Sequence, residues 1–138
     1  MKIAVSACLL GENCKYSGGN NFSAKVADFV KGHEVTAVCP ETLGGLPVPR
    51  QRSEIVNGVV RYEDGTPVDS EFRRGAGIAL KIVEDSGAEL VILQSRSPSC
   101  GAKEVYDGSF SGRLVSGQGI FAHLLEERGI RVIDVSDL

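Results

Sequence analysis

The sequence lacks the features by which several large classes of protein are recognised. Its 15 basic and 18 acidic side chains leave a net charge of -3, so no basic surface for nucleic acid or for an anionic membrane is indicated. No apolar run approaches the roughly 18 residues of a membrane span. We therefore expect neither a polynucleotide nor a membrane as the partner of this protein.

Cysteine and histidine are also scarce, with four cysteines and two histidines in 138 residues. So few cysteines do not make a disulfide scaffold, and a reducing cytoplasm is the expected location. The apolar stretch before Cys8 in "MKIAVSAC" is shorter than the roughly 7 to 15 residues that a signal peptide needs, which favours a strand. A composition with 42% hydrophobic and 24% charged residues predicts one globular domain over residues 1–138.

Segments with the periods of strands and helices alternate along the chain. The strand-like runs lie at 2–8, 33–39, 88–95 and 130–135. Helical spacing is seen at 21–32, at 118–129 and in a stripe that starts from Asp69 or Ser70 as N-cap, ends at Gly87 and comprises Phe72, Ala76, Ala79, Leu80 and Val83. This alternation predicts right-handed crossovers and a sheet covered on both faces.

The expected fold class is therefore α/β, a three-layer α/β/α sandwich with a Rossmann-like, mostly parallel sheet. The pair Asn57-Gly58, between "EIV" and "VVRY", predicts an inserted β-hairpin with a two-residue turn. The stretch 96–117, rich in glycine and serine, is predicted to be a loop. The glycines of "GAGIAL" lie within a helical pattern, which indicates close helix packing rather than a dinucleotide site.

Three of the four cysteines follow predicted strands. Cys8 ends the first strand, Cys39 ends the second, and Cys100 lies in the loop after the third. Because the carboxyl ends of parallel strands share one edge of a sheet, the three thiols are expected to converge on one site. Each cysteine taken alone could equally be a structural core residue.

The spacing of the cysteines narrows the choice of metal. Zinc sites usually contain close pairs such as C-x2-C, and Cys8 and Cys14 are separated by five residues. A 4Fe-4S cluster takes thiolates from separate loops, and with three ligands it keeps one iron open to substrate as a Lewis acid. Cys14 either closes such a cluster or is a free thiol in a long loop.

Further polar residues lie close to these cysteines. Glu41 follows Cys39 and is either a general acid or base or an exposed turn residue. Ser97 and Ser99 flank a proline before Cys100, where they form the turn or donate hydrogen bonds to a cluster sulfur or a substrate. Arg50 or Arg52 could clamp an anion, although a solvated loop is the default interpretation of this segment.

Three long motifs carry a resemblance that spans essentially the whole chain. They are "SACLLGENCKYSGG", "CPETLGGLPVPRQRSEI" and "SRSPSCGAKEVYDGSFSGRL". Together they resemble the bacterial domain-of-unknown-function 523 family, whose characterised members include 2-thiouracil desulfurases. The resemblance implies a 4Fe-4S cluster on Cys8, Cys39 and Cys100 with one open iron, a catalytic glutamate at Glu41 and an essential serine at Ser97, with Ser99 as its competitor.

The implied activity is the non-redox conversion of a thiolated pyrimidine base or nucleoside to its oxo form with release of sulfide. The implied partner is that small molecule, bound by a monomer or weak homodimer, with Ser99 and Arg50 as substrate contacts. Two alternatives stay open at this point. One is a non-catalytic module that binds zinc through all four cysteines or binds a small molecule, and the other is cysteine-nucleophile catalysis, for which neither histidine is well placed.

Overall fold

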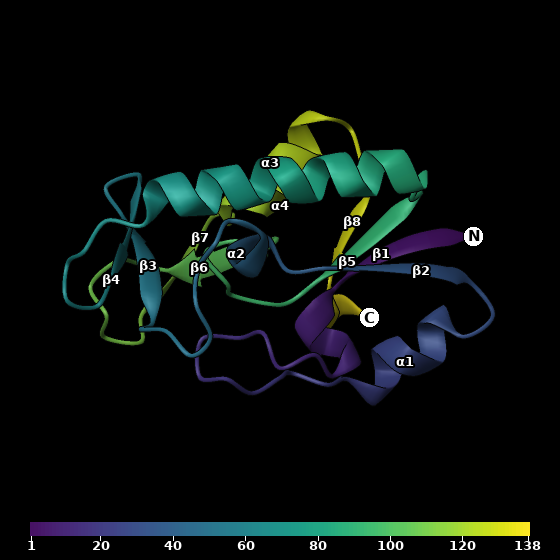
Figure 1. Cartoon of the computed structure of the whole chain (residues 1–138), viewed down its shortest axis with the longest axis horizontal. Helices are drawn as coiled ribbons and strands as arrows, with labels where there is room; N and C mark the ends of the chain where they lie inside the picture. Colours follow the sequence, from purple (N-terminus) through teal and green to yellow (C-terminus); the bar gives the residue numbers. More distant parts are fainter.

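The structure is a computed structural model that describes residues 1–138 (Figure 1). Its elements, in chain order, are β1 (Lys2–Ser6), η1 (Ala7–Leu10), α1 (Ala24–Val30), β2 (Glu34–Val38), α2 (Pro40–Leu43), β3 (Ser53–Val56), β4 (Val59–Tyr62), α3 (Asp69–Ser86), β5 (Leu90–Leu93), β6 (Glu104–Tyr106), β7 (Leu114–Ser116), α4 (Ile120–Glu127), β8 (Val132–Asp134) and η2 (Val135–Asp137). None of the helices has the length and apolar character needed to cross a membrane.

The central sheet has four strands in the order β2-β1-β5-β8, and every pair in it is parallel. The chain moves from β1 outward to β2, then crosses back to β5 and continues to β8. The order of the strands therefore reverses between β1 and β5, and the crevice beyond their carboxyl ends is the usual ligand site of such sheets. This arrangement confirms the predicted parallel, Rossmann-like sheet.

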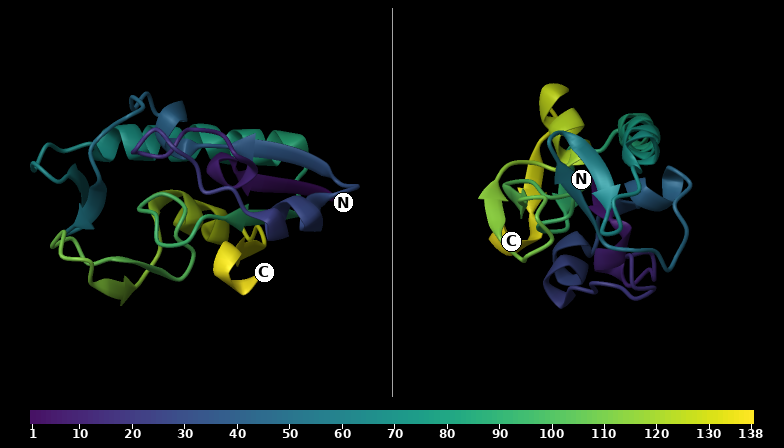
Figure 2. Two further views of the ribbon diagram at one scale, coloured as in Figure 1. Left: turned by 90° about the horizontal axis from the view of Figure 1, so that it is seen from below. Right: turned by 90° about the vertical axis from the view of Figure 1, so that its left-hand side faces the viewer.

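The sheet is covered on both faces, as predicted. Helices α3 and α4 pack on one face, where they share an apolar core with β1, β2 and β5. Helix α1 and the short helix η1 pack on the other face, and Figures 1 and 2 show these layers. Strand β5, "LVIL", is buried along its whole length, which is the pattern of a central parallel strand. The apolar stripe predicted from Phe72 to Val83 is the buried face of α3.

Two hairpins extend beyond the carboxyl edge of the sheet (Figures 1 and 2). The predicted hairpin is β3–β4, and its turn residues Asn57 and Gly58 both have the positive φ angles of a type I′ turn. The second hairpin, β6–β7, occupies the stretch predicted to be a loop. That prediction was wrong because strands of only three residues between glycines and serines carry almost no periodic signal.

Several predicted boundaries also differ from the structure. Strand β1 ends at Ser6, so Cys8 lies in η1 rather than at the strand's last residue. Helix α3 is capped by Val68, whereas Asp69 accepts a hydrogen bond from the Val60 amide at 2.9 Å. The Asp69 carboxylate, which was predicted to cap the helix, therefore binds the β3–β4 hairpin instead.

A close contact between two glycines sets the position of α2, which the sequence did not predict. A Cβ on Gly75 would lie 1.8 Å from the Pro40 carbonyl oxygen, and a Cβ on Gly44 would lie 2.0 Å from the Glu71 carbonyl oxygen. Helix α2 therefore rests directly on the backbone of α3. Close packing is confirmed for Gly75, but it was wrong for Gly77, which has no neighbour within 4 Å of its Cβ position.

This contact predicts that two glycine-to-alanine substitutions in α3 change the free energy of unfolding in opposite directions. Gly75→Ala is expected to lower the free energy of unfolding by about 1–3 kcal/mol or more, because the methyl group forces α2 away from α3. Gly77→Ala is expected to raise it by about 0.5–1 kcal/mol through helix propensity. Urea unfolding of the two variants measures both values, and equal effects would contradict the packing described here.

Candidate active site

A cavity of about 740 Å³ opens at the carboxyl edge of the sheet, within the roughly 300–1,000 Å³ typical of small-molecule sites. Segments that follow β1, β2 and β5 form its floor, and the two hairpins contribute to its walls. It therefore lies at the strand-order reversal between β1 and β5. Neither histidine of the chain lines it, so a cysteine nucleophile there has no imidazole base.

All four cysteines line this cavity, and all four are free thiols. Cys8 is placed by η1, Cys39 is the N-cap of α2, and Cys100 follows a serine-rich turn after β5. Cys14, which the sequence left undecided, is a buried thiol of the same cavity. The structure thus brings together the three thiols predicted to converge and adds the fourth.

The four thiols do not form a site for a single metal ion. No group of three or more cysteine, histidine, aspartate or glutamate side chains is arranged so that it could hold one. A tetrahedral zinc site needs four donors within about 2.3 Å of one point, so the four-cysteine zinc alternative finds no support in this geometry. Thiols presented by separate loops around a larger space are the donor set that suits an iron–sulfur cluster.

The protonation of the thiols follows from their surroundings. Burial raises the pKa of Cys8, and the Asn21 side-chain amide, which donates to its sulfur at 3.5 Å, lowers it in part. Burial likewise raises the pKa of Cys100. The neighbouring Cys14 thiol lowers the pKa of Cys39, and the pKa of Cys14 itself is raised. Bound iron would offset the cost of burying these thiolates, because coordination deprotonates a thiol.

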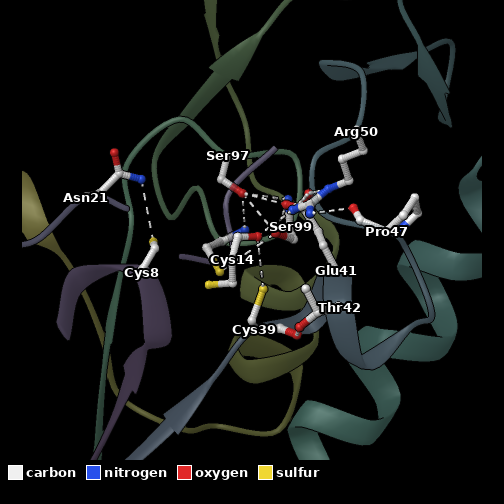
Figure 3. A network of polar contacts seen from close by, with 11 residues as sticks. Cys8, Cys14, Asn21, Cys39, Glu41, Thr42, Pro47, Arg50, Ser97 and Ser99 are labelled. Atoms are coloured by element: carbon white, nitrogen blue, oxygen red, sulfur yellow. Dashed lines mark hydrogen bonds and ion pairs between the residues drawn. The ribbon is translucent and has the colours of Figure 1, made fainter. Parts of the chain in front are cut away.

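Glu41 lies in the first turn of α2 with both carboxylate oxygens engaged (Figure 3). Its Oε1 accepts from Arg50 Nη2 at 2.8 Å and Nε at 3.2 Å, and its Oε2 accepts from Ser99 Oγ at 2.7 Å. The side chain is only 14% exposed. The reading of Glu41 as an exposed turn residue is therefore wrong.

Arg50 is held inside the protein rather than in a solvated loop. Its side chain is 3% exposed, and besides Glu41 it donates to the carbonyl oxygens of Cys14 at 3.0 Å and Pro47 at 3.1 Å. The guanidinium thus joins the Cys14 loop, α2 and the segment before β3. Because these donors already have partners within the chain, the predicted contact of Arg50 with substrate stays a prediction.

The two serines take distinct positions in one hydrogen-bonded chain. The Ser97 hydroxyl accepts from the amides of Ser99 at 3.1 Å and Cys100 at 3.0 Å, which shapes the turn, and it lies 2.8 Å from Ser99 Oγ. Since Ser99 donates its proton to Glu41, Ser97 is the donor in the contact between the hydroxyls. The shortest contacts therefore run from Ser97 to Ser99 to Glu41, and Ser97 Oγ also has a longer contact of 3.5 Å with Glu41 Oε2. Ser99 is 2% exposed, and Ser97 is the more accessible of the two.

Two residues of the site were missed by the sequence analysis. Asn21 precedes α1 in a run of glycine and asparagine, which has the composition of an ordinary turn. Ser6 accepts from the Gln94 amide at 3.0 Å and so joins the ends of β1 and β5 at the strand-order reversal. The pairing of β1 with β5 reveals the role of Ser6, and only the folded position of the loop before α1 reveals that of Asn21.

The fold and the site together define an α/β protein whose parallel sheet carries a thiol-lined cavity at its carboxyl edge, with a carboxylate and two hydroxyls beside the thiols. The family model described as 2-thiouracil desulfurase matches residues 3–137. The chain therefore belongs to the 2-thiouracil desulfurase family.

Two individual proteins are similar to it over nearly their whole length. The uncharacterised protein YbbK of Bacillus subtilis (strain 168) is 36% identical, with 99% of this chain and 97% of that protein covered. The solved structure of the [4Fe-4S]-dependent thiouracil desulfidase TudS (DUF523Vcz) is 38% identical and superposes with a TM-score of 0.92, covering 99% of this chain and 92% of that chain. The fold class predicted from the sequence is the fold of that enzyme.

The Arg50–Glu41 pair predicts a large loss of stability when one partner is removed. Arg50→Met is expected to lower the free energy of unfolding by about 3–5 kcal/mol, because it leaves a buried carboxylate without its cation. Arg52→Met removes the exposed pair with Glu63 and is expected to change stability far less, because water screens an exposed ion pair. Urea unfolding at neutral pH measures both, and adding Glu41→Gln to Arg50→Met should restore part of the loss. Equal losses in the two arginine variants would contradict a structural role for this pair.

Proposed function

We propose that this protein is an iron–sulfur-dependent desulfurase that converts a thiouracil-like base or nucleoside to its oxo form and releases sulfide. The observation that carries the proposal is that free thiols lie in one cavity beside a carboxylate linked to two serine hydroxyls. Membership of the 2-thiouracil desulfurase family and the close likeness to a [4Fe-4S]-dependent thiouracil desulfidase support it.

Cys8, Cys39 and Cys100 would hold a 4Fe-4S cluster, and Cys14 would stay a free thiol. The three proposed ligands follow three different strands, and a hydrogen-bond donor already lies against one of their sulfurs, because the Asn21 side-chain amide donates to Cys8 Sγ at 3.5 Å. Such hydrogen bonds are a usual second layer around cluster ligands. When bound, the cluster would supply an open Lewis-acidic iron that polarises the thiocarbonyl bond without a change of oxidation state.

The chain's own residues would handle the protons of the reaction. Water supplies the oxygen of the new carbonyl and sulfur leaves as sulfide, so no electrons are exchanged. Ser97, the more accessible hydroxyl, would take up a proton from the attacking water as it passes its own to Ser99, and Ser99 would deliver one to Glu41 Oε2. Arg50, bound to Oε1, holds the carboxylate so that Oε2 faces Ser99.

The proposed ligand set predicts which cysteines are needed for the cluster. After anaerobic reconstitution the wild type is expected to contain iron and sulfide at about four each per chain and to release sulfide from 2-thiouracil. Serine at Cys8, Cys39 or Cys100 should abolish stable cluster binding, whereas Cys14→Ser should retain it. Iron and sulfide analysis, combined with a sulfide-release assay, tests this ligand set. A protein that contains only zinc and no sulfide would contradict the proposal.

The hydroxyl relay makes a separate prediction for turnover. Ser99→Ala and Glu41→Gln are expected to lower kcat by about 10²–10⁴-fold with the cluster still bound, because each interrupts proton transfer. Ser70→Ala is a suitable control, since Ser70 is exposed at the start of α3 and does not line the cavity. Steady-state kinetics on cluster-loaded protein measures the effect. A wild-type kcat in Ser99→Ala would show that Ser97 acts without the second hydroxyl.

A further inference from the structure

The outer part of the cavity is walled by two hairpins that belong to no larger sheet. Ser53 and Glu54 of strand β3 line it, together with Arg52 just before the strand. The β6–β7 hairpin contributes Glu104 and Tyr106. Each hairpin has only two strands and is separate from the central sheet. The β3–β4 hairpin packs against Phe72 of α3 through the buried Val60, and Val105 of β6 forms a single bridge with Arg96. Because a two-stranded hairpin is at best marginally stable by itself, the contacts made by the β6–β7 hairpin decide how firmly this part of the wall is held.

One buried carboxylate joins the two hairpins. Glu54, on β3, is 6% exposed, and its Oε1 accepts from the amides of Gly108 at 2.9 Å and Phe110 at 3.1 Å. These amides belong to the loop between β6 and β7. No other hydrogen bond links the hairpins to each other. We call this contact of Glu54 with Gly108 and Phe110 the hairpin clasp.

The backbone around the clasp is shaped for close approach. A Cβ on Gly108 would lie 2.6 Å from the Ile55 carbonyl oxygen, and Gly108 has a φ of +93°. Phe110 also has a positive φ, of 56°, a conformation that non-glycine residues rarely adopt. This local arrangement turns two amides of the loop toward one anion, as in other backbone anion sites. The loop is thus built around the Glu54 carboxylate.

We propose that Glu54 is a positioning residue that fixes the β6–β7 hairpin, with Tyr106, as a preformed wall of the substrate cavity and so determines substrate affinity. The proposal rests on the proposed function of the cavity. Glu41 and the two serines sit on α2 and on the turn after β5, and neither segment makes a hydrogen bond of the clasp. Loss of the clasp therefore affects binding of the substrate, which must then order the wall itself, rather than the chemical step.

The test uses full-length, cluster-loaded protein and 2-thiouracil. Glu54→Ala is expected to raise KM about tenfold with kcat within about twofold of wild type, the size expected for losing hydrogen bonds to a charged group. Glu54→Gln keeps an oxygen that can accept from both amides and should restore KM to within about twofold. Ser111→Ala, an exposed change in the same loop, is the matched control and should behave as wild type.

Amide hydrogen exchange supplies a readout independent of turnover. Exchange across 107–112 should accelerate in Glu54→Ala and not in Glu54→Gln or Ser111→Ala. Gly108→Ala disrupts the clasp from the β6–β7 loop, because the added methyl group would clash with the Ile55 carbonyl oxygen. It should raise KM in the same way, and the double variant should show no further increase over Glu54→Ala. If Glu54→Ala fails to fold, Gly108→Ala carries the same test.

Three results would overturn the proposal: an unchanged KM in Glu54→Ala, a fall in kcat as large as the fall in kcat/KM, or unchanged exchange in the loop. A raised KM in Glu54→Gln would instead show that the carboxylate charge touches substrate directly, which also overturns it. If the wild type releases no sulfide, the proposed function fails by itself. The clasp is then judged by exchange and by calorimetric binding of 2-thiouracil, where equal affinities in wild type and Glu54→Ala count against it.

Discussion

The buried ion pair between Arg50 and Glu41 is the interaction on which the rest of the site depends. Its guanidinium also reaches the carbonyl oxygens of Cys14 and Pro47, so a single side chain joins three segments that have no strand pairing with one another. Its carboxylate extends the connection to the turn after β5 through Ser99. The segments that carry Cys14, Cys39 and Cys100 thus meet around this ion pair. Both of its charged groups also form hydrogen bonds with other residues.

The same pair gives the cavity its chemical asymmetry. Its lining contains both thiols and hydroxyls that end on a carboxylate. In the proposed function the thiols would bind a soft metal and the hydroxyls would carry protons. Hydrolytic removal of sulfur needs both: an electrophile that polarises a carbon–sulfur bond and groups that move protons to and from water. Neither redox chemistry nor a histidine is needed for that division of roles.

The sequence was most informative where local pattern and topology coincide. Alternating strands and helices predicted the parallel sheet, and that topology alone brought Cys8, Cys39 and Cys100 to one edge. The sequence was least informative where a side chain contacts residues far away along the chain. Helix α2 lies against α3 because Gly44 and Gly75 allow the two backbones to touch. Nothing near Arg50 or Glu54 in the sequence indicates that either side chain is buried against a distant partner. The hairpin at Asn57-Gly58 was predicted correctly because its turn signal is local. The β6–β7 hairpin was missed because its strands have only three residues each.

The proposed reaction requires that Cys8, Cys39 and Cys100 hold the cluster, that one iron stays open to the substrate, and that Cys14 is not a ligand. The most direct test is the Mössbauer spectrum of protein reconstituted anaerobically with ⁵⁷Fe, recorded with and without 2-thiouracil. The account predicts that one iron site changes its spectrum when the substrate is added, in the wild type and equally in Cys14→Ser. A spectrum that the substrate leaves unchanged, or one altered by Cys14→Ser alone, would contradict it.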